Sequence, residues 1–406
     1  MAKAIVAGTI VHGDEMERRA VDLYARGFNP AVTKEWKSEG MIDFHCHDRV
    51  YTDEDSCFEG DGGIAQYHDA PLWMKQDAVG AIHRGIACTW AGLRGRLEYL
   101  VKQKIQAKEK ELWLICDCSP DIGDRSFRVA LELKKKYMDQ IGIKIGIYPI
   151  FGFKSHTSKE GKARIELVRD LARLPAAGFL VGLPERDARP DHAEMGFDGH
   201  NAIMLDLAIN LELPYVVHLG QSGRPGENEA ARTIEAVRWA RETAKLRGKR
   251  PPRVIFVHDL SVASEPEPVY VSHVRALREN NVELCVCPYA TISSRSLRQY
   301  SAPLHNLIAR VLEARLAGVP VWIGTDNICD IFVRRPVSAS VVRELDVFAN
   351  SLRFYDENVI YKIARGEPFN NSDYAALKRN LELDFAAWGI PQGLDAYLAM
   401  NPAFQG

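Results

Sequence analysis

A (β/α)8 barrel, the TIM-barrel architecture, is the fold class that the sequence predicts, and two observations lead to it. From residue 41 onward, short apolar runs rich in β-branched and aromatic residues alternate with longer stretches whose apolar residues recur at helical spacing. Eight such units follow one another, which is typical of βα units that form a parallel sheet. Barrels of this class commonly exceed about 250 residues as one domain, so 406 residues do not require a second large domain.

The expected strands are short, and each ends close to a polar or turn-forming residue. They are MIDFHCH near residue 41, ELWLICDC near 111, IKIGIYPI near 143, GFLVGLP near 178, PYVVHLG near 214, RVIFVHDL near 253, VELCVCP near 282 and VPVWIGTDN near 320. The segments between them have apolar residues at helical spacing and are expected to be helices: RSFRVALELKKKYMDQI, ARIELVRDLARL, NAIMLDLAINLE, EAARTIEAVRWARETAK and LHNLIARVLEARLAG.

The chain is expected to have three parts. Residues 1–40 form an N-terminal extension, residues 41–365 form the barrel, and residues 366–406, which contain DYAALKRNLELDFAAW, form a C-terminal helical extension. The first connection, residues 48–110, is much longer than the others and contains the acidic stretch TDEDSCFEGDGG. A connection of this length is either an active-site lid or a plain surface excursion, and the sequence does not choose between them.

Composition and charge favour a small-molecule partner. The 52 basic and 54 acidic residues leave a net charge of −2, which gives no general attraction to nucleic acid or to an anionic membrane. The basic segment KLRGKRPPR lies between a helix and a strand and is interpreted as a solvated connection. The N-terminal run lacks a signal-peptide pattern, and no apolar run approaches the ~20 residues of a membrane span. We therefore expect a cytoplasmic enzyme, and a homo-oligomer.

Cysteines occur in pairs within two of the expected strands. Cys116 with Cys118, and Cys285 with Cys287, are spaced CxC, so both members of each pair would face the same side of a strand. A thiol in such an apolar run normally behaves as a small buried hydrophobe. Tetrahedral cysteine sites for zinc generally use wider ligand spacing, so we interpret these thiols as structural, without disulfides.

Histidines and one aspartate stand at the ends of four expected strands. In HCH, alternation places His45 and His47 on one face at the carboxyl end of the first strand, where two imidazoles can bind one divalent ion. Such a pair is weak evidence by itself. However, strand five ends with His218, strand six with His258 and strand eight with Asp326, and the carboxyl ends of barrel strands meet around one axis. The five side chains together predict a metal site.

With these residues in place, the sequence resembles the amidohydrolase superfamily over residues 41 to about 330. In that superfamily HxH after strand one, His after strands five and six, and Asp after strand eight hold one or two metals. The segments HCHDR (45–49), VGLPER (181–186) and HLGQ (218–221) resemble motifs of its cytosine-deaminase-like branch. The β-sandwich usual in the superfamily looks reduced or absent, because only about forty residues precede strand one and the tail reads helical.

The resemblance implies a single metal ion. Binuclear members carry a bridging lysine at the end of strand four, where this chain has Gly182, Leu183, Pro184 and Glu185. Lys154, after strand three, is the one nearby lysine and is a weak candidate for that role. His45, His47, His218 and Asp326 would hold either Zn2+ or Fe2+, because imidazole and carboxylate ligands suit both.

The resemblance also implies catalytic roles. The metal would lower the pKa of a bound water so that hydroxide can attack, Asp326 would accept the proton of that water, and His258 would hydrogen-bond the hydroxide or the developing oxygen. The plain alternatives remain a strand-end cap for Asp326 and a satisfied buried histidine for His258.

Two departures from the branch concern the substrate. Deaminases of the branch carry a proton-relaying Glu three residues after the strand-five His, where this chain has Gln221; an amide cannot relay a proton, so Asp326 acts alone or another carboxylate substitutes. Ile150 stands where cytosine deaminase presents a glutamine, so cytosine itself is not expected as the substrate. The candidate substitutes for the missing Glu are Glu185, Glu227 and Asp259.

Arginines around the same mouth suggest an anionic substituent on the substrate. Arg49 aligns with the basic residue of the first motif, and Arg186 follows strand four. Arg334 or Arg335 would add a further cation after strand eight. The alternative is that these arginines are solvated surface residues, and Arg49, Glu185, Arg186 and Ile150 are the substrate-binding candidates.

The function that these features predict is metal-dependent hydrolysis of a C–N bond in a small cyclic or aromatic compound, by deamination or by removal of an N-substituent. Hydrolysis of an amide or lactam is the alternative within enzymes, because it needs less proton relay and so tolerates Gln221. An alternative of another class is a metal-binding barrel without catalysis, which the retention of His258 and Asp326 argues against.

Overall fold

The computed structural model describes residues 3–6, 9–12, 15, 18, 36–50, 67, 70, 72–192, 194–221, 223, 226–293, 308–333 and 339–404. The acidic stretch of the long first connection, and Arg334 and Arg335, lie outside these residues. The chain divides into two compact units, Met1–Lys37 and Ser38–Gly406. In the first unit, strands β1 (Lys3–Val6) and β2 (Thr9–His12) pair antiparallel as a two-stranded sheet.

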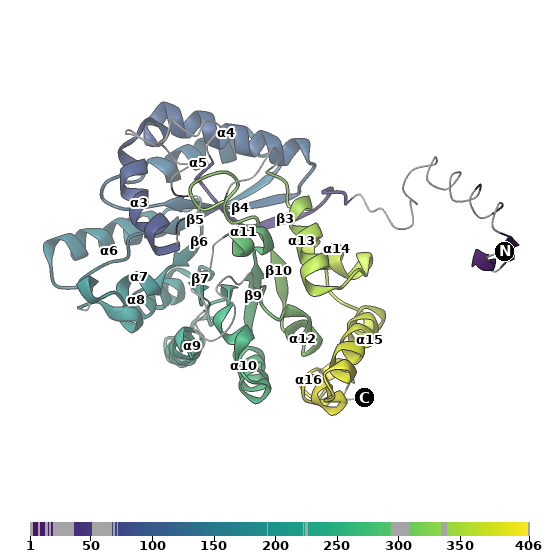
Figure 1. Ribbon diagram of the computed structural model, residues 1–406. Helices are drawn as coiled ribbons and strands as arrows, with labels where there is room; N and C mark the ends of the chain where they lie inside the picture. Colours follow the sequence, from purple (N-terminus) through teal and green to yellow (C-terminus); the bar gives the residue numbers. More distant parts are fainter. Residues whose placement is uncertain are drawn as a thin grey trace. The chain divides into compact units, whose positions relative to one another are not determined.

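The second unit is built on eight parallel strands that occur in the sheet in their order along the chain. Figure 1 shows these strands with helices around them. This arrangement confirms the predicted (β/α)8 barrel. The strands are β3 (Ile42–His47), β4 (Glu111–Asp117), β5 (Gly142–Tyr148), β6 (Ala177–Gly182), β7 (Tyr215–Leu219), β8 (Val254–His258), β9 (Val282–Val286) and β10 (Val321–Ile323).

The first and last strands meet just beyond β10, at Asp326. Its amide donates to the carbonyl of His45 at 2.6 Å, and its own carbonyl accepts from the amide of His47 at 2.8 Å. Gly324 makes this approach possible, because a Cβ there would lie 2.6 Å from the Cβ of His45. Closure of the barrel therefore fixes Asp326 beside both histidines of β3.

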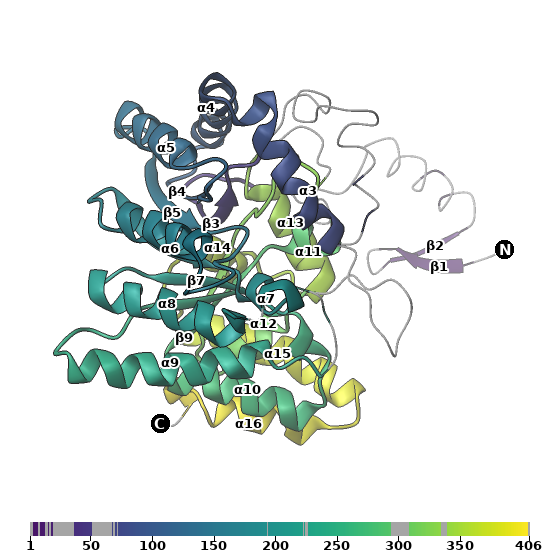
Figure 2. The same cartoon turned by 90° about the vertical axis from the view of Figure 1, so that its left-hand side faces the viewer.

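Helices cover the outside of the barrel, as Figure 2 shows. The residues between strands form α3 (Leu72–Arg84), α4 (Trp90–Gln106), α5 (Arg125–Lys136), α6 (Lys159–Ala172), α7 (Pro184–Asp187), α8 (Gly196–Leu211), α9 (Glu229–Leu246), α10 (Glu267–Glu279), α11 (Pro288–Ser293) and α12 (Val311–Leu316). The remaining helices follow β10: α13 (Val342–Leu352), α14 (Glu357–Arg365), α15 (Asn371–Ala387) and α16 (Asp395–Leu398).

The predicted C-terminal helical extension is confirmed. Helix α15 begins with a capping box, in which the Asn370 side chain accepts from the amide of Asp373 and the Asp373 carboxylate accepts from the amide of Asn370. The segment after it is tied to the barrel helices: the buried Tyr397 donates its hydroxyl to Glu267 at 2.5 Å, and the Asn401 amide donates to the Leu316 carbonyl at 2.7 Å. In the described part of the chain no helix is long and apolar enough to cross a membrane.

A buried ion network supports the strand that carries the two histidines. Lys104, on α4, lies 2.6 Å from Asp43 and 3.3 Å from Glu109, and all three side chains are fully buried. Asp43 also accepts hydrogen bonds from the amide and the hydroxyl of Thr325, at 2.9 and 2.5 Å. The network therefore joins β3 to the turn that carries Asp326.

Replacing Lys104 by methionine is expected to lower the free energy of unfolding by about 3–5 kcal/mol, because it leaves two carboxylates buried without their cation. Denaturant unfolding of wild type and K104M measures the difference. Lys102→Met is the matched control, since Lys102 lies on the same helix and is 62% exposed in its ion pair with Glu98. A loss no larger than that of the control would contradict a structural role for the network.

Candidate metal centre and active site

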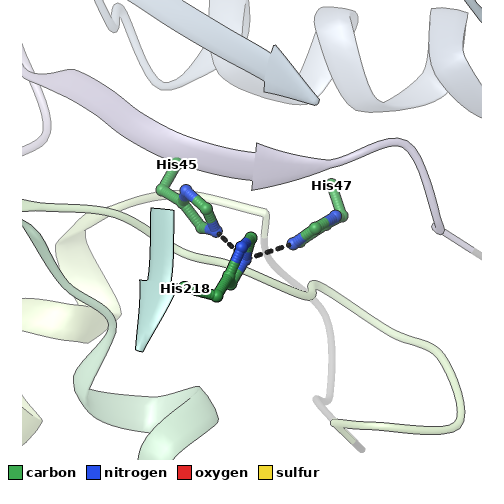
Figure 3. Close-up of side chains that lie close together, drawn as sticks. All are labelled: His45, His47 and His218. Atoms are coloured by element: carbon green, nitrogen blue, oxygen red, sulfur yellow. Dashed lines mark hydrogen bonds between the residues drawn. The ribbon is translucent and has the colours of Figure 1, made fainter. Parts of the chain in front are cut away.

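Three histidine side chains converge at the carboxyl end of the barrel. The Nε2 atom of His218, from β7, lies 3.0 Å from Nε2 of His45 and 3.3 Å from Nε2 of His47, both from β3. Figure 3 shows the three rings pointing at a common point. Each is at most 2% exposed. The alternation predicted for HCH therefore places both β3 imidazoles on the inner face, opposite His218.

The protonation of these rings suits metal binding. Burial lowers the pKa of His218 to about 4. Burial, the Arg49 cation and the neighbouring imidazoles lower the pKa of His45 and His47 well below the ordinary value. The Nδ1–H of His218 can donate to the carbonyl of Gly182 at 3.0 Å, which leaves the Nε2 lone pair facing the other two rings. Three neutral imidazoles with converging lone pairs fit the ligand set of a divalent transition metal.

Asp326 and His258 complete the five-residue cluster that the sequence predicts. One carboxylate oxygen of Asp326, Oδ1, lies 3.3 Å from Nε2 of His47, and the other, Oδ2, lies 3.3 Å from Nε2 of His258. Both residues adopt left-handed backbone conformations, with φ of +57° and +70°, which cost energy in residues other than glycine. The backbone thus holds an unfavourable conformation at the two positions where these side chains turn toward the histidines.

A pocket opens beside the cluster and is lined by His47 and His218. Four of the predicted substrate or catalytic residues also line it: Arg49, Ile150, Gln221 and Asp326. Asp326 is the one carboxylate among its described lining residues. Several polar residues of this pocket were not predicted from the sequence, because none of them belongs to a recognisable motif. The further lining residues are Leu72, Gln76, Tyr148, Ala290, Asn327, Phe332 and Val333.

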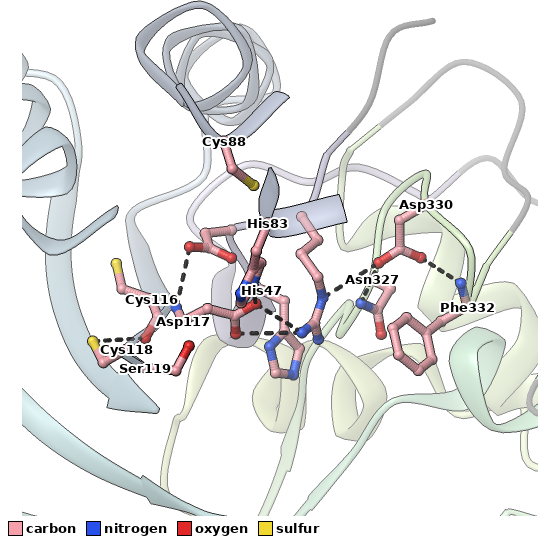
Figure 4. Close-up of polar contacts among 12 residues, drawn as sticks. His47, His83, Cys88, Cys116, Asp117, Cys118, Ser119, Asn327, Asp330 and Phe332 are labelled. Carbon is pink, nitrogen blue, oxygen red and sulfur yellow. Dashed lines mark hydrogen bonds and ion pairs between the residues drawn. The ribbon is translucent and has the colours of Figure 1, made fainter. Parts of the chain in front are cut away.

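Arg49 lies in the pocket wall with its charge already paired. Its guanidinium donates to Asp117 at 3.0 and 3.3 Å, lies 3.6 Å from Asp330, and stacks 5.0 Å from the ring centroid of Phe332. Figure 4 shows Asp117, Asp330 and Phe332, with His83 close to Asp117. The Nε2 of His83 lies 3.3 Å from Asp117. Although burial opposes it, the hydrogen bonds of His83 to Asp117 and Asp121 raise its pKa to about 9, so two cationic groups share the Asp117 carboxylate. Arg49 is therefore held rigidly and is not a solvated surface arginine.

Three other residues singled out in the sequence are placed away from this pocket. Arg186 donates to Asp77 at 3.1 Å and lines a separate depression together with Lys154, whose ammonium pairs with Glu160 at 3.2 Å. Lys154 is thus not at the histidine cluster. Glu185 does not line the pocket either.

The carboxylates considered as substitutes for a relaying Glu have other partners. Glu227 accepts from the Ser261 hydroxyl at 2.8 Å, and Asp259 pairs with His273 at 2.7 Å. A further carboxylate, Glu229, accepts from the Gly220 amide at 3.0 Å, and burial with the neighbouring Glu185 and Glu227 raises its pKa to about 10. None of these groups is among the described lining residues of the pocket that contains Gln221.

A cysteine also joins the cluster, and sequence analysis interpreted it as structural. Cys287, directly after β9, is fully buried. His258, Cys287 and Asp326 each offer one potential ligand atom, and these three atoms lie within 4.8 Å of one another. His45, His47 and His218 form a second such group. The position of Cys287 directly after a strand was the sequence feature that could have predicted its place in the cluster.

Solved structures share the fold of this chain. They include 5-methylcytosine deaminase from Klebsiella pneumoniae, which is 17% identical with a TM-score of 0.64 over 83% of this chain and 74% of that one. The chain has the same fold as this deaminase. N-isopropylammelide isopropylaminohydrolase from Burkholderia multivorans (15% identity, TM-score 0.54, 90% and 77% coverage) and adenine deaminase from Arthrobacter aurescens (12%, 0.51, 87% and 99%) share it. No family model and no curated protein matches the sequence.

Proposed function

We propose that this chain is a metal-dependent hydrolase that cleaves a C–N bond in a small cyclic or aromatic compound, by deamination or by removal of an N-substituent. The observation that carries the proposal is the convergence of three imidazole Nε2 atoms beside the Asp326–His258 pair at the carboxyl end of a barrel. The names of the proteins that share the fold, two deaminases and an isopropylaminohydrolase, agree with this reaction class.

The metal would be held by His45, His47, His218 and one oxygen of Asp326. Three nitrogen donors and one oxygen donor suit Zn2+ or Fe2+. The pairing of Lys154 with Glu160 in a separate depression agrees with one catalytic ion. When bound, such an ion lowers the pKa of a coordinated water toward neutrality and supplies the nucleophile at ordinary pH.

The protein's own groups would manage the protons and the substrate. Asp326 is the carboxylate positioned to accept the proton of the attacking water and to pass it to the leaving nitrogen. His258, whose Nε2 lies 3.3 Å from the second oxygen of Asp326, would donate to the oxygen that develops negative charge at the attacked carbon. Gln221 would orient the substrate through its amide, and Arg49 would present its guanidinium, held by Asp117, from the pocket wall.

Hydrolysis of an amide or lactam is the second candidate, and Gln221 favours it. An amide side chain cannot relay a proton, and no further carboxylate lines the pocket in the described part of the chain. Ring opening needs one proton transfer to a nitrogen that stays on the product, which Asp326 can supply alone. Both candidates use the same water activation. Lactam opening keeps the nitrogen in the product, whereas deamination and hydrolysis of an open-chain amide release it.

The test combines metal analysis with product analysis. The purified protein is expected to contain about one zinc or iron per chain and to release ammonia or an alkylamine from at least one amino-heterocycle in a panel. Turnover of a lactam that keeps all nitrogen in the product, or release of nitrogen from open-chain amides but from no amino-heterocycle, would replace deamination by amide or lactam hydrolysis. A metal-loaded protein that converts no amino-heterocycle, amide or lactam would contradict the proposal and favour a binding protein.

A further inference from the structure

The cluster offers donors for more than one cation. Asp326 presents its two carboxylate oxygens in different directions: Oδ1 faces His47, which belongs to the three-histidine group, and Oδ2 faces His258. His258 in turn belongs with Asp326 to the second group of converging donors, whose third member is Cys287. The two groups therefore lie on opposite oxygens of one carboxylate.

We propose that His258, Cys287 and Asp326 form a second metal site, which takes a thiophilic divalent cation such as Zn2+ or Cd2+ and shares Asp326 with the catalytic ion. The three residues come from the ends of consecutive strands: His258 ends β8, Cys287 follows β9 and Asp326 follows β10. They are at most 7% exposed, and their nitrogen, sulfur and oxygen donors lie within 4.8 Å of one another. Three protein donors plus one water complete the tetrahedral coordination that zinc favours.

The donor set selects the kind of ion. A thiol paired with an imidazole favours Zn2+, Cd2+ or Co2+ over Mg2+ and Ca2+, which prefer sets made of oxygen donors. Binding would displace the proton of the Cys287 thiol to solvent, because the thiolate is the ligand. Occupancy of this site is therefore expected to release one proton from the protein for each cation bound there.

Occupancy of the second site would inhibit the enzyme. In the proposed function, Asp326 accepts the proton of the attacking water and His258 stabilises the developing oxygen. A cation held by His258 and Oδ2 of Asp326 would occupy both groups. Asp326 could then not accept the proton, and His258 could not stabilise the developing oxygen. This consequence rests on the proposed function, whereas the second site itself depends on the three donors alone.

Metal stoichiometry tests the site independently of activity. Equilibrium dialysis of the intact wild-type chain against increasing Cd2+ is expected to give two ions per chain at saturation, and an ultraviolet cadmium–thiolate absorption band as the second ion binds. Cys287→Ala is expected to bind one ion and to lack the band. Cys285→Ala is the matched control, because Cys285 is buried on β9, two residues before Cys287, but belongs to neither group of donors, so it should behave like wild type.

Several outcomes decide the proposal. A wild-type protein without a thiolate band at saturating Cd2+ would overturn it, as would equal loss of the band in C287A and C285A. If C287A does not fold, Cys287→Ser replaces it, because the serine side chain is of similar size to cysteine. The circular dichroism spectrum of C287S, compared with that of wild type, shows whether this variant folds. Loss of the second ion and of the band in C287S would support the site, and retention of both would overturn it.

Inhibition by excess zinc separates this inference from the proposed function. If both hold, zinc beyond one equivalent inhibits wild type and C285A. The zinc concentration for half-inhibition is at least tenfold higher in C287A than in C285A, when the activity of each variant is expressed relative to its own one-zinc form. If no substrate is turned over, the proposed function fails, while the cadmium band still reports the second site. If turnover is found and excess zinc inhibits C287A as strongly as C285A, the inhibitory role of the site is wrong.

Discussion

Asp326→Asn is expected to lower kcat by about 10^3-fold or more, while the protein keeps its fold and most of its metal. Removing a positioned general base typically costs about 10^2–10^4-fold, and no second carboxylate is among the described lining residues to replace this one. The amide preserves the shape and one oxygen donor of the side chain but cannot accept a proton. Steady-state kinetics on the substrate found in the nitrogen-release panel measures the effect.

The controls for this variant separate chemistry from metal loss. Metal content measured on the same sample should remain near that of wild type, because the three histidines are unchanged. Asp198→Asn is the matched acidic control, since Asp198 pairs with Arg232 on the surface and is expected to leave kcat unchanged. If D326N keeps more than a tenth of the wild-type kcat, Asp326 is not the base and the proton path must be reassigned.

The barrel and its five-residue cluster could be predicted because both follow from local rules. Strand alternation placed His45 and His47 on one face, and the shared direction of parallel strands placed His218, His258 and Asp326 at the same end. These inferences need only the element type and its boundary, which an apolar run and its flanking residues indicate.

The surroundings of the cluster could not be predicted, because they depend on contacts between distant residues. Arg49 carries the same charge whether it binds a substrate anion or, as here, Asp117 and Asp330, and the sequence does not reveal which partner it has. Burial and pairing at a barrel mouth depend on loop packing, which has no period to detect. Arg186 and Lys154, directed into another depression, illustrate the same point.

Cys287 shows a different difficulty. The pattern LCVCP is equally compatible with two thiols inside a barrel core and with one thiol beyond the end of the strand. The strand β9 ends at Val286, so Cys285 lies within it and Cys287 lies directly after it, at the level of the other cluster residues. A shift of one residue in the strand boundary changes the interpretation, and boundaries are the least predictable part of an element.

Removing the metal is expected to abolish turnover, with a decrease of at least about 10^3-fold in kcat/KM, because several kcal/mol of barrier lowering depend on the ion. Dialysis of the wild type against a chelator should produce this loss, and adding back Zn2+ or Fe2+ should restore activity. The same dialysis should lower the thermal midpoint, since an ion at about 1,000 times its Kd stabilises the folded state by about 4 kcal/mol.

His218→Ala extends this prediction to a single ligand. The variant is expected to bind less than a tenth of the wild-type metal under the same conditions, and added Zn2+ should not restore its turnover, because one of three converging imidazoles is missing. The exposed His156→Ala should keep the wild-type metal content and activity, which excludes a general effect of losing a histidine. Full turnover in the chelated wild type would show that the ion is not needed. Rescue of H218A by zinc at stoichiometric concentration would show that His218 is not a ligand, and the cluster would then hold its ion through β3 and Asp326.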